Sequence, residues 1–199
     1  MKNIASSIAI ILFVMTMHNA MAQSEGTNEF KVGYGAFSSI QFLDLASDLT
    51  ITGATAGNLA YDNKKFSNTL YGSYKHALND NIMLGATFAY ERIEDDAKSG
   101  KNIIGKRDSK NYTAAVEADY YYMSDTFIRM YSGLGLGYSF NNQKFRSSDP
   151  DYKNQDDNLS HFNFHVNAFG IRVGNALGVF AEVGFGYKGI VNAGLSYQF

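Results

Sequence analysis

The sequence contains no cysteine, no tryptophan and only one proline, Pro150. Without cysteine the fold has no disulfide bonds, and thiol catalysis and cysteine-ligated metals are excluded. Charge of one sign is also lacking, since 17 lysines and arginines face 19 acidic residues, and this near balance argues against a nucleic-acid partner. After residue 23, no apolar run approaches the roughly 18 residues that a membrane-spanning helix needs. Any membrane span would therefore consist of strands.

The first 22 residues have the three parts of a secretory signal peptide. Lys2 gives the charged start, residues 8–15 (IAIILFVM) give the apolar run, and Ala20 and Ala22 give an A-x-A cleavage site before Gln23. The run is too short to span a bilayer as a helix. We therefore expect a signal peptide at residues 1–22 and one exported domain at residues 23–199.

What the sequence does contain is typical of strands: 19 glycines, 14 tyrosines and 15 phenylalanines. Eight segments alternate apolar and polar or small residues with the period of two that marks a strand with unlike faces. They are residues 30–37, 66–78, 82–92, 112–123, 127–140, 161–173, 179–187 and 192–199. The connections after the first, third and fifth strands are long and polar, and the others are short. This order predicts an all-β, eight-stranded antiparallel up-and-down barrel.

Two segments depart from simple alternation. Within the first long connection, residues 40–49 (IQFLDLASDL) carry apolar residues at mixed helical spacings, which fit a short helix without deciding for it. In the sixth strand the apolar role shifts to the other row near Ala168, which predicts a β-bulge there.

Alternation alone does not say whether the apolar row faces a core or lipid, and a secreted lipocalin-type barrel would also have eight strands. Residue size favours lipid, because the polar rows are rich in glycine, which suits a crowded interior. The glycines are Gly33, Gly35, Gly85, Gly133, Gly135, Gly137, Gly184 and Gly186. The opposite row places tyrosines near strand ends, as in the aromatic girdles of membrane barrels. These are Tyr34, Tyr90, Tyr112, Tyr120, Tyr122, Tyr138, Tyr187 and Tyr197.

With these features the chain resembles the small eight-stranded bacterial outer-membrane proteins of the OmpA-barrel and OmpX type. In that family the last strand carries the pattern polar-x-Gly-x-x-aromatic-x-aromatic, which the barrel assembly machinery reads. Asn192, Gly194, Tyr197 and Phe199 match it position by position. The resemblance implies a monomer in the bacterial outer membrane, in contact with outer-membrane lipid and lipopolysaccharide.

Charged residues on the polar rows predict an interior polar network of Glu91, Glu117, Asp119, Arg129 and Glu182. A three-residue turn at residues 124–126 would pair Tyr121 with Arg129 and make Asp119 a diagonal neighbour of Arg129. Eight strands leave an interior just filled by side chains. We therefore expect an ion-paired plug rather than a pore.

No metal, cofactor or catalytic residue is expected. His161 and His165 share a face, but four strand residues separate them by roughly 13 Å, too far to chelate one metal. Lipid A deacylases and palmitoyltransferases occur on this fold, and the resemblance would require a serine, a histidine and an acid at one barrel end. Ser160 and His161 lie beside an acidic loop, but any loop of this composition supplies such a set by chance.

The sequence thus predicts a non-enzymatic integral outer-membrane protein whose outer loops serve surface contacts or envelope integrity. Two alternatives remain open: a narrow porin-like channel for small solutes, and a lipid A-modifying enzyme. What the outer loops bind is not encoded in periodicity.

Overall fold

The computed structural model describes residues 25–55, 59–99, 102–150 and 153–199. The expected signal peptide therefore lies outside the described residues. The elements in chain order are β1 (Asn28–Ala36), α2 (Ser39–Ala54), β2 (Leu59–Phe66), β3 (Thr69–Ala77), β4 (Ile82–Ser99), β5 (Asn102–Ser124), β6 (Ile128–Ser147), β7 (Gln155–Gly174), β8 (Leu177–Gly186) and β9 (Val191–Gln198).

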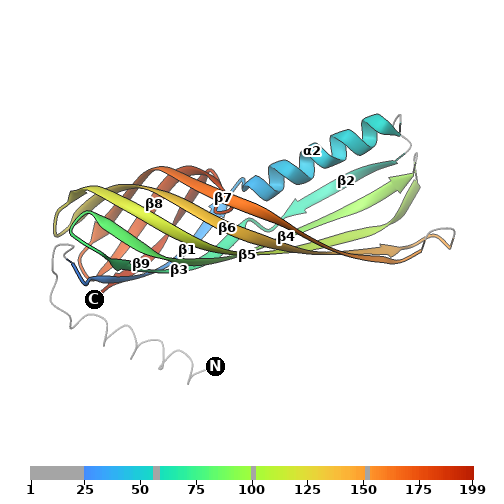
Figure 1. Ribbon diagram of the computed structural model, residues 1–199. Helices are drawn as coiled ribbons and strands as arrows, with labels where there is room; N and C mark the ends of the chain where they lie inside the picture. The colour runs from blue at the N-terminus through green and yellow to red at the C-terminus, as the bar shows by residue number, and fades with distance from the viewer. Residues whose placement is uncertain (1–24, 56–58, 100–101, 151–152) are drawn as a thin grey trace, which may run out of the picture.

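Eight of the strands form a closed antiparallel ring, as predicted (Figure 1). Apart from β2, each strand pairs with the strands before and after it in the chain. Strand β1 closes the ring by pairing with β9, where Phe30 lies opposite Tyr197. Closure gives every barrel strand two hydrogen-bonded neighbours, so the ring has no free edge. The predicted bulge near Ala168 is confirmed by the register shift between Asn167 and Phe169.

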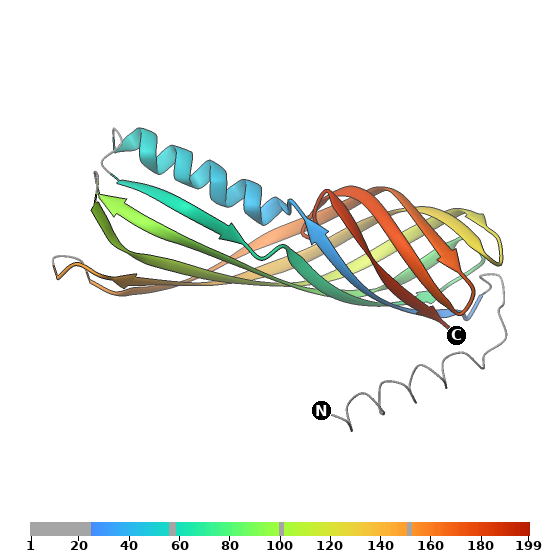
Figure 2. The ribbon, with the colours of Figure 1, turned by 180° about the vertical axis from the view of Figure 1, so that it is seen from behind.

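Four strands continue beyond the ring, and these parts correct the prediction of long polar loops. Residues 93–99, 102–111, 141–147 and 155–160 belong to β4, β5, β6 and β7. The short strand β2 adds to the same edge of β4, above β3, with Phe66 opposite Ile93. We call residues 59–66, 91–99, 102–111, 141–147 and 155–160, together with α2, the strand extension. It projects from one end of the barrel, away from the short turns (Figures 1 and 2).

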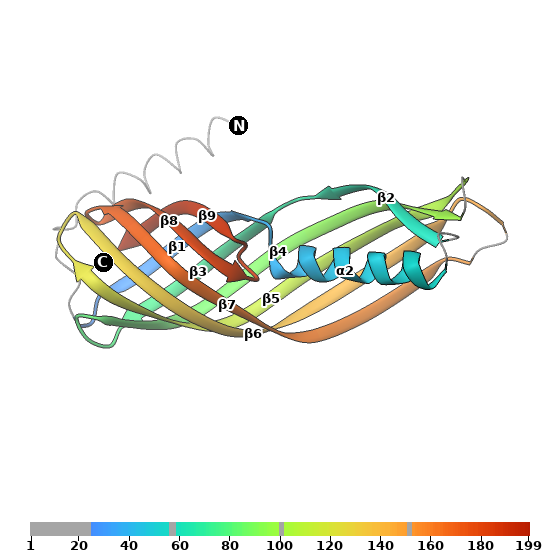
Figure 3. The same ribbon diagram turned by 90° about the horizontal axis from the view of Figure 1, so that it is seen from above.

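Helix α2 covers the open side of the strand extension, between β2 and β7 (Figure 3). Ser38 begins the helix, because its hydroxyl accepts a hydrogen bond from the Gln41 amide. Thr55 ends it, and its amide bonds the Ile51 carbonyl. The helix is longer than the segment that helical spacing suggested, since it runs over all 16 residues of Ser39–Ala54. In the part of the chain that the structure describes, no helix is long and apolar enough to cross a membrane.

The two faces of the ring differ as the glycines predict. The outward row is apolar and exposed, for example Val32, Val116 and Leu134, whereas the inward positions between them are buried. Gly33 shows why the inward row needs small residues, because a Cβ there would lie far closer to Cζ of Tyr71 than van der Waals contact allows. The interior is therefore filled by side chains, as expected for eight strands.

Tyr187 is a correction to the predicted outward girdle. It is buried, and its hydroxyl donates a hydrogen bond to Glu117 inside the barrel. The reason is local: β8 ends at Gly186, whose φ of +141° is open to glycine, and the chain turns inward there. The other tyrosines of the girdle prediction lie on the outward row.

Candidate functional site

The barrel interior holds a set of buried acidic and basic side chains. They come from β1, β3, β5, β6, β7, β8 and the turn before β9. They are Glu29, Lys31, Lys75, Glu117, Asp119, Arg129, Arg172, Glu182 and Lys188. We call this set the interior network. On the strands, these residues occupy the inward positions of the alternating pattern, between outward neighbours such as Phe30 and Val32 around Lys31 and Val116 and Ala118 around Glu117.

Lys75 is the main cation at the middle of the interior network. Its Nζ lies 2.5 Å from Asp119 Oδ2 and 2.7 Å from Glu117 Oε2, and its side chain is 1% exposed. Glu117 also accepts a hydrogen bond from the Tyr187 hydroxyl at 2.7 Å and lies 3.2 Å from Lys188 Nζ. Each carboxylate thus has partners for its charge, which is the condition for burying it.

Lys31 and Lys188 connect the Lys75 contacts to Glu182 on β8. Lys31 Nζ lies 3.5 Å from Glu182 and 3.7 Å from Asp119, and it donates to the Tyr131 hydroxyl at 2.9 Å. Lys188 Nζ lies 3.1 Å from Glu182. The contacts cross the barrel from β1 to β5 and β8, so the network fills the cross-section and does not line a passage.

The predicted pairing of Tyr121 with Arg129 is wrong. Tyr121 lies opposite Tyr131, and Arg129 lies opposite Ser124 on β5 and Arg172 on β7. Arg129 is fully buried at the short-turn end, away from its expected neighbour Asp119. Asp119 is neutralised instead by Lys75 and Lys31. These two lysines were missed, although the polar rows of residues 30–37 and 66–78 already placed them inside.

Glu91 lies apart from the interior network, at the mouth of the barrel. Its Oε2 accepts hydrogen bonds from the Ser38 hydroxyl at 2.6 Å and the Thr69 hydroxyl at 3.3 Å. Ser38 also caps α2, so this buried carboxylate lies at the positive end of the helix dipole. Glu91 therefore fixes the point where α2 leaves the barrel.

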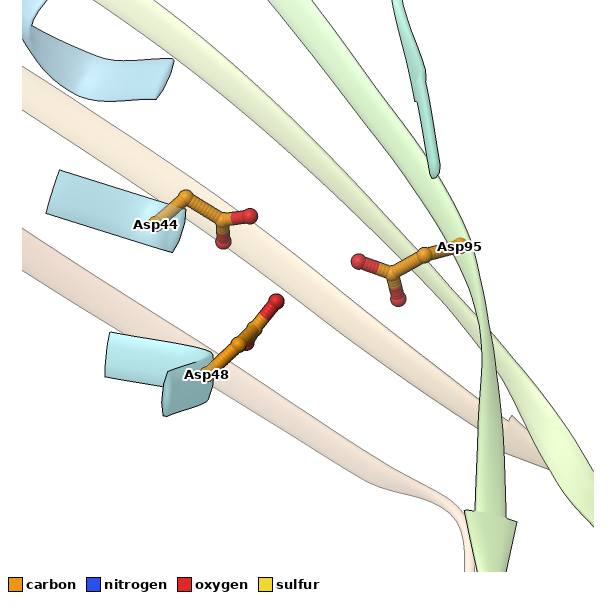
Figure 4. Close-up of side chains that lie close together, drawn as sticks. All are labelled: Asp44, Asp48 and Asp95. Atoms are coloured by element: carbon orange, nitrogen blue, oxygen red, sulfur yellow. The ribbon is translucent and has the colours of Figure 1, made fainter. Parts of the chain in front are cut away.

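A second ion-paired cluster holds α2 against the strand extension. Asp44 and Asp48 lie one helical turn apart and face Asp95 on β4 (Figure 4). Arg107 on β5 contacts all three, with Nη2 at 3.1 Å from Asp44 and 3.4 Å from Asp48 and Nε at 2.9 Å from Asp95. Lys64 on β2 forms ion pairs with Asp44 and Asp48. We call these five residues the helix anchor.

The three carboxylates of the helix anchor offer ligand atoms within 4.8 Å of one another, close enough for one metal ion. Lys64 and Arg107 already contact these carboxylates, and they would repel a cation. Arg107 also stacks on the Tyr61 ring, 4.0 Å from its centroid, which fixes the guanidinium in place. The arrangement is that of an ion-pair cluster that joins a helix to three strands.

Replacing Arg107 by glutamine is expected to loosen α2 and leave the barrel intact. Asp44 and Asp48 would then share Lys64, Asp95 would lose its ion pair with Arg107, and the repulsion among the three carboxylates would act on the helix. Amides of residues 39–54 are expected to exchange with deuterium at least ~10-fold faster, equivalent to about 1.4 kcal/mol. Amides of β8 and β9 should exchange as before. The matched control is Lys106→Gln on the opposite face of β5, and unchanged helix exchange in Arg107→Gln would contradict this role.

On its outward face the strand extension carries exposed ion pairs. Arg92 donates two hydrogen bonds to Asp108, at 2.8 and 2.9 Å, and these hold the pKa of Asp108 below its usual value of 3.8. Arg146 pairs with Asp156 in the same way, and the pKa of that carboxyl is lowered too. A lowered carboxyl pKa stabilises the folded strands above pH 3.8, and this contribution disappears as the pH falls through the lowered pKa.

The pH dependence gives a local prediction. Hydrogen exchange at residues 91–111 is expected to accelerate, relative to the intrinsic rate, as the pH falls below about 4. The change should be small because exposed pairs contribute little. Asp108→Asn should remove most of the dependence, and a dependence that survives in this variant would point to another group.

Ser160 and His161 do not form a catalytic arrangement. They are adjacent on β7, so their side chains point to opposite faces: Ser160 is exposed outside and His161 faces inward. His161 and His165 do share the inward face, as predicted. Their cross-strand partners, Ser139 and Gly135, are not metal ligands of the kind that would complete a site.

The four residues of the expected assembly pattern lie on β9 and at its end. Asn192 faces inward and accepts a hydrogen bond from Tyr71 at 2.5 Å, and Gly194 allows the close approach of β1. Tyr197 and Phe199 stack with ring centroids 5.5 Å apart, and Phe199 lies 6.0 Å from Phe30. The two aromatic rings thus cover the seam where β9 meets β1.

The outward row ends sharply toward the strand extension. On β4 and β5 the last aromatic residues are Tyr90 and Tyr112, which lie opposite each other, and the next outward residues are Arg92 and Lys110. An apolar outer band with aromatic residues at its border, around a closed and filled eight-stranded ring, defines the class of small outer-membrane β-barrels.

Comparison with solved structures agrees with that class. The N-terminal β-barrel domain of Pseudomonas aeruginosa OprF matches with a TM-score of 0.51 and 13% identity, covering 89% of this chain and 100% of that one. Pseudomonas aeruginosa OprG matches at 0.48 and 11%, covering 91% and 99%, and Ail, the attachment invasion locus protein of Yersinia pestis, at 0.42 and 13%, covering 88% and 99%. No family model and no curated protein matches the chain. The expected OmpA/OmpX-type fold is confirmed, and identities this low show the fold alone.

Proposed function

We propose that this protein is a non-enzymatic integral protein of the bacterial outer membrane, whose plugged barrel carries the strand extension as a rigid structure for surface contacts. The observation that carries the proposal is the outward row. Val32, Val116 and Leu134 are each more than half exposed, which a water-soluble barrel would not show on every strand. Lipid is the solvent that this band fits.

The orientation follows from the two ends of the barrel. In outer-membrane barrels the short turns face the periplasm and the long connections face outward. The turn around residues 79–81 is short, whereas β4 and β5 rise well past the apolar band. The strand extension would therefore stand outside the cell.

Fractionation with a heat-modifiability gel tests this placement. The protein is expected in the outer membrane, and its band should shift on boiling because the closed ring resists detergent until heated. Recovery in the soluble fraction without detergent would support a lipocalin-type barrel and reject the proposal.

The interior network supports a structural barrel over a channel. Lys75 links β3 to β5 and Lys31 links β1 to β8, pairs of strands that are not neighbours in the ring, and their partners are almost fully buried. Planar-bilayer recording of the folded protein is expected to be silent, and steady single-channel steps would favour the channel instead. The opposite orientations of Ser160 and His161 support the absence of an enzyme, which lipid A mass spectrometry with and without the protein would check.

Contacts with lipopolysaccharide are proposed for the border of the apolar band. Arg92 and Lys110 lie opposite each other on the outward face, directly above Tyr90 and Tyr112. This is the height at which lipid phosphates would lie, and basic side chains bind phosphate. Arg92→Gln/Lys110→Gln is the variant that would weaken such contacts. A spin-labelled or fluorescent lipopolysaccharide should then exchange faster at the barrel surface.

Recognition by the barrel assembly machinery is proposed for Asn192, Gly194, Tyr197 and Phe199. Phe199→Ser is expected to reduce the folded, heat-modifiable form in the outer membrane several-fold while the protein still refolds from urea into detergent. Leu195→Ser, on the same face of β9 but outside the pattern, is the matched control. Equal insertion of the two variants would remove Phe199 from the signal.

A further inference from the structure

Helix α2 turns an uncharged face away from the strand extension. Its charged residues, Asp44 and Asp48, point into the helix anchor. Among the residues of α2, all of which the structure describes, the exposed ones carry no charge. They are Phe42, Leu43, Leu45, Ala46, Ser47, Leu49, Thr50, Gly53 and Ala54. Leu49 is 69% exposed and Leu43 54%. A helix outside the apolar band has no reason to expose these side chains to water.

Neighbouring surfaces at the same height are different. The outward face of the extended strands carries Arg92, Glu94, Asp108 and Lys144. The apolar face of α2 is instead continuous with the barrel's apolar band, since the Phe42 ring lies 5.7 Å from the ring of Phe185 on β8. One side of the molecule is therefore apolar from the barrel wall up along the helix.

On the membrane placement proposed above, lipid would reach only the start of this face. The helix runs outward from the barrel mouth alongside the extended strands (Figures 1 and 3), and 16 residues span roughly 24 Å. Only its first turn, with Phe42 beside Phe185, adjoins the apolar band. The occupant must therefore reach both the band and the space above it.

We propose that this face binds the same face of a second copy of the chain, which makes the protein a homodimer in the membrane. Two copies in one membrane share the direction of their barrel axes, so a twofold axis along the membrane normal would place their α2 helices side by side and parallel. Under such symmetry each face meets an identical face, and because this face is uncharged, no like charges would be brought together.

The spacing on the helix fits close helix pairing. Phe42, Leu45 and Leu49 follow the i, i+3, i+7 spacing of a coiled-coil seam. Ala46 and Gly53, beside that seam, are small enough to let two helices approach closely. The resemblance to small outer-membrane barrels implies a monomer. Helix α2, which strand periodicity does not report, changes this expectation.

The test uses cysteine, which the native chain lacks. In the full-length protein in outer membranes, Leu49→Cys is expected to form a disulfide-linked dimer under mild oxidation. Lys144→Cys, exposed on β6 on another side of the extension, is the matched control and should remain monomeric. Ala46→Glu/Leu49→Glu should abolish the native dimer, measured by light scattering in mild detergent, while the band still shifts on boiling.

Three outcomes would overturn the proposal: a monomer in both measurements, equal cross-linking of the two cysteine variants, or cross-linking of Leu49→Cys to a different protein. The geometry rests on the membrane placement proposed above. The two failures are distinguishable, because a heat-modifiable outer-membrane band without a dimer rejects only this inference, whereas a soluble protein rejects both.

Discussion

Lys75→Met is expected to destabilise the folded barrel by about 3–5 kcal/mol, the cost of removing one partner from a buried ion pair. Lys75 Nζ lies 2.5 Å from Asp119 and 2.7 Å from Glu117. After the change, Glu117 keeps Lys188 and Tyr187, but Asp119 is left with Lys31 at 3.7 Å. An under-compensated carboxylate would then be buried in the barrel interior. The measurement is urea unfolding of the protein in lipid vesicles, followed by the heat-modifiable band.

A double change gives the control for Lys75. Adding Asp119→Leu removes the carboxylate that Lys75→Met leaves under-compensated, and it should restore most of the lost free energy of unfolding, because replacing both partners of a buried pair by apolar residues is often nearly neutral. Equal losses for Lys75→Met and the double variant would contradict the interior network as the source of stability. A water-filled lumen around Lys75 would give a loss below about 1 kcal/mol, as for an exposed pair.

Leu134→Arg is expected to cost about 2–4 kcal/mol, the price of a basic residue at the middle of a bilayer. Leu134 lies near the centre of the outward row of β6 and is 64% exposed. In water, an exposed leucine tolerates arginine with little change in stability. The expected loss therefore depends on lipid as the surrounding medium.

Asn142→Arg is the matched control on the same strand and the same face. It lies past Phe140, where the outward row has become polar, and its change should stay within about 0.5 kcal/mol. Both variants would be unfolded with urea from vesicles. Equal, small effects at the two positions would place the apolar row outside the hydrocarbon region.

Much of the barrel was predictable because its strands separate two unlike surroundings. Alternation on β1, β4 and β9 marks two faces, and the glycines identify the crowded one. In the strand extension the face that α2 covers is buried but carries charged residues such as Asp95 and Arg107, so apolar and polar residues do not alternate there. Residues 93–111 are mostly polar in sequence and were therefore interpreted as a loop, although residues 93–99 continue β4 and residues 102–111 continue β5.

Register and helix packing were less visible in the sequence. The three-residue turn proposed for residues 124–126 pairs the same faces of β5 and β6 as the structure does along the strands. Near the turn the structure differs, because Ser124 pairs with Arg129 and a bulge lies between Tyr121 and Met123. The extra residue of the bulge brings inward residues opposite inward residues again, so a match of faces along the strands did not reveal the wrong register. In α2 the buried face carries Asp44 and Asp48 and the exposed face is apolar, the reverse of a surface helix, and only the partners Lys64 and Arg107 explain it.

The most direct test of the central claim, that the outward row faces lipid, uses the absence of tryptophan. Leu136→Trp introduces a single tryptophan on the outward row, and Asn142→Trp introduces one above the band. In vesicles of lipid brominated at the middle of the acyl chain, fluorescence of Leu136→Trp is expected to be strongly quenched and that of Asn142→Trp little affected. Equal fluorescence of Leu136→Trp in brominated and ordinary lipid would contradict the account.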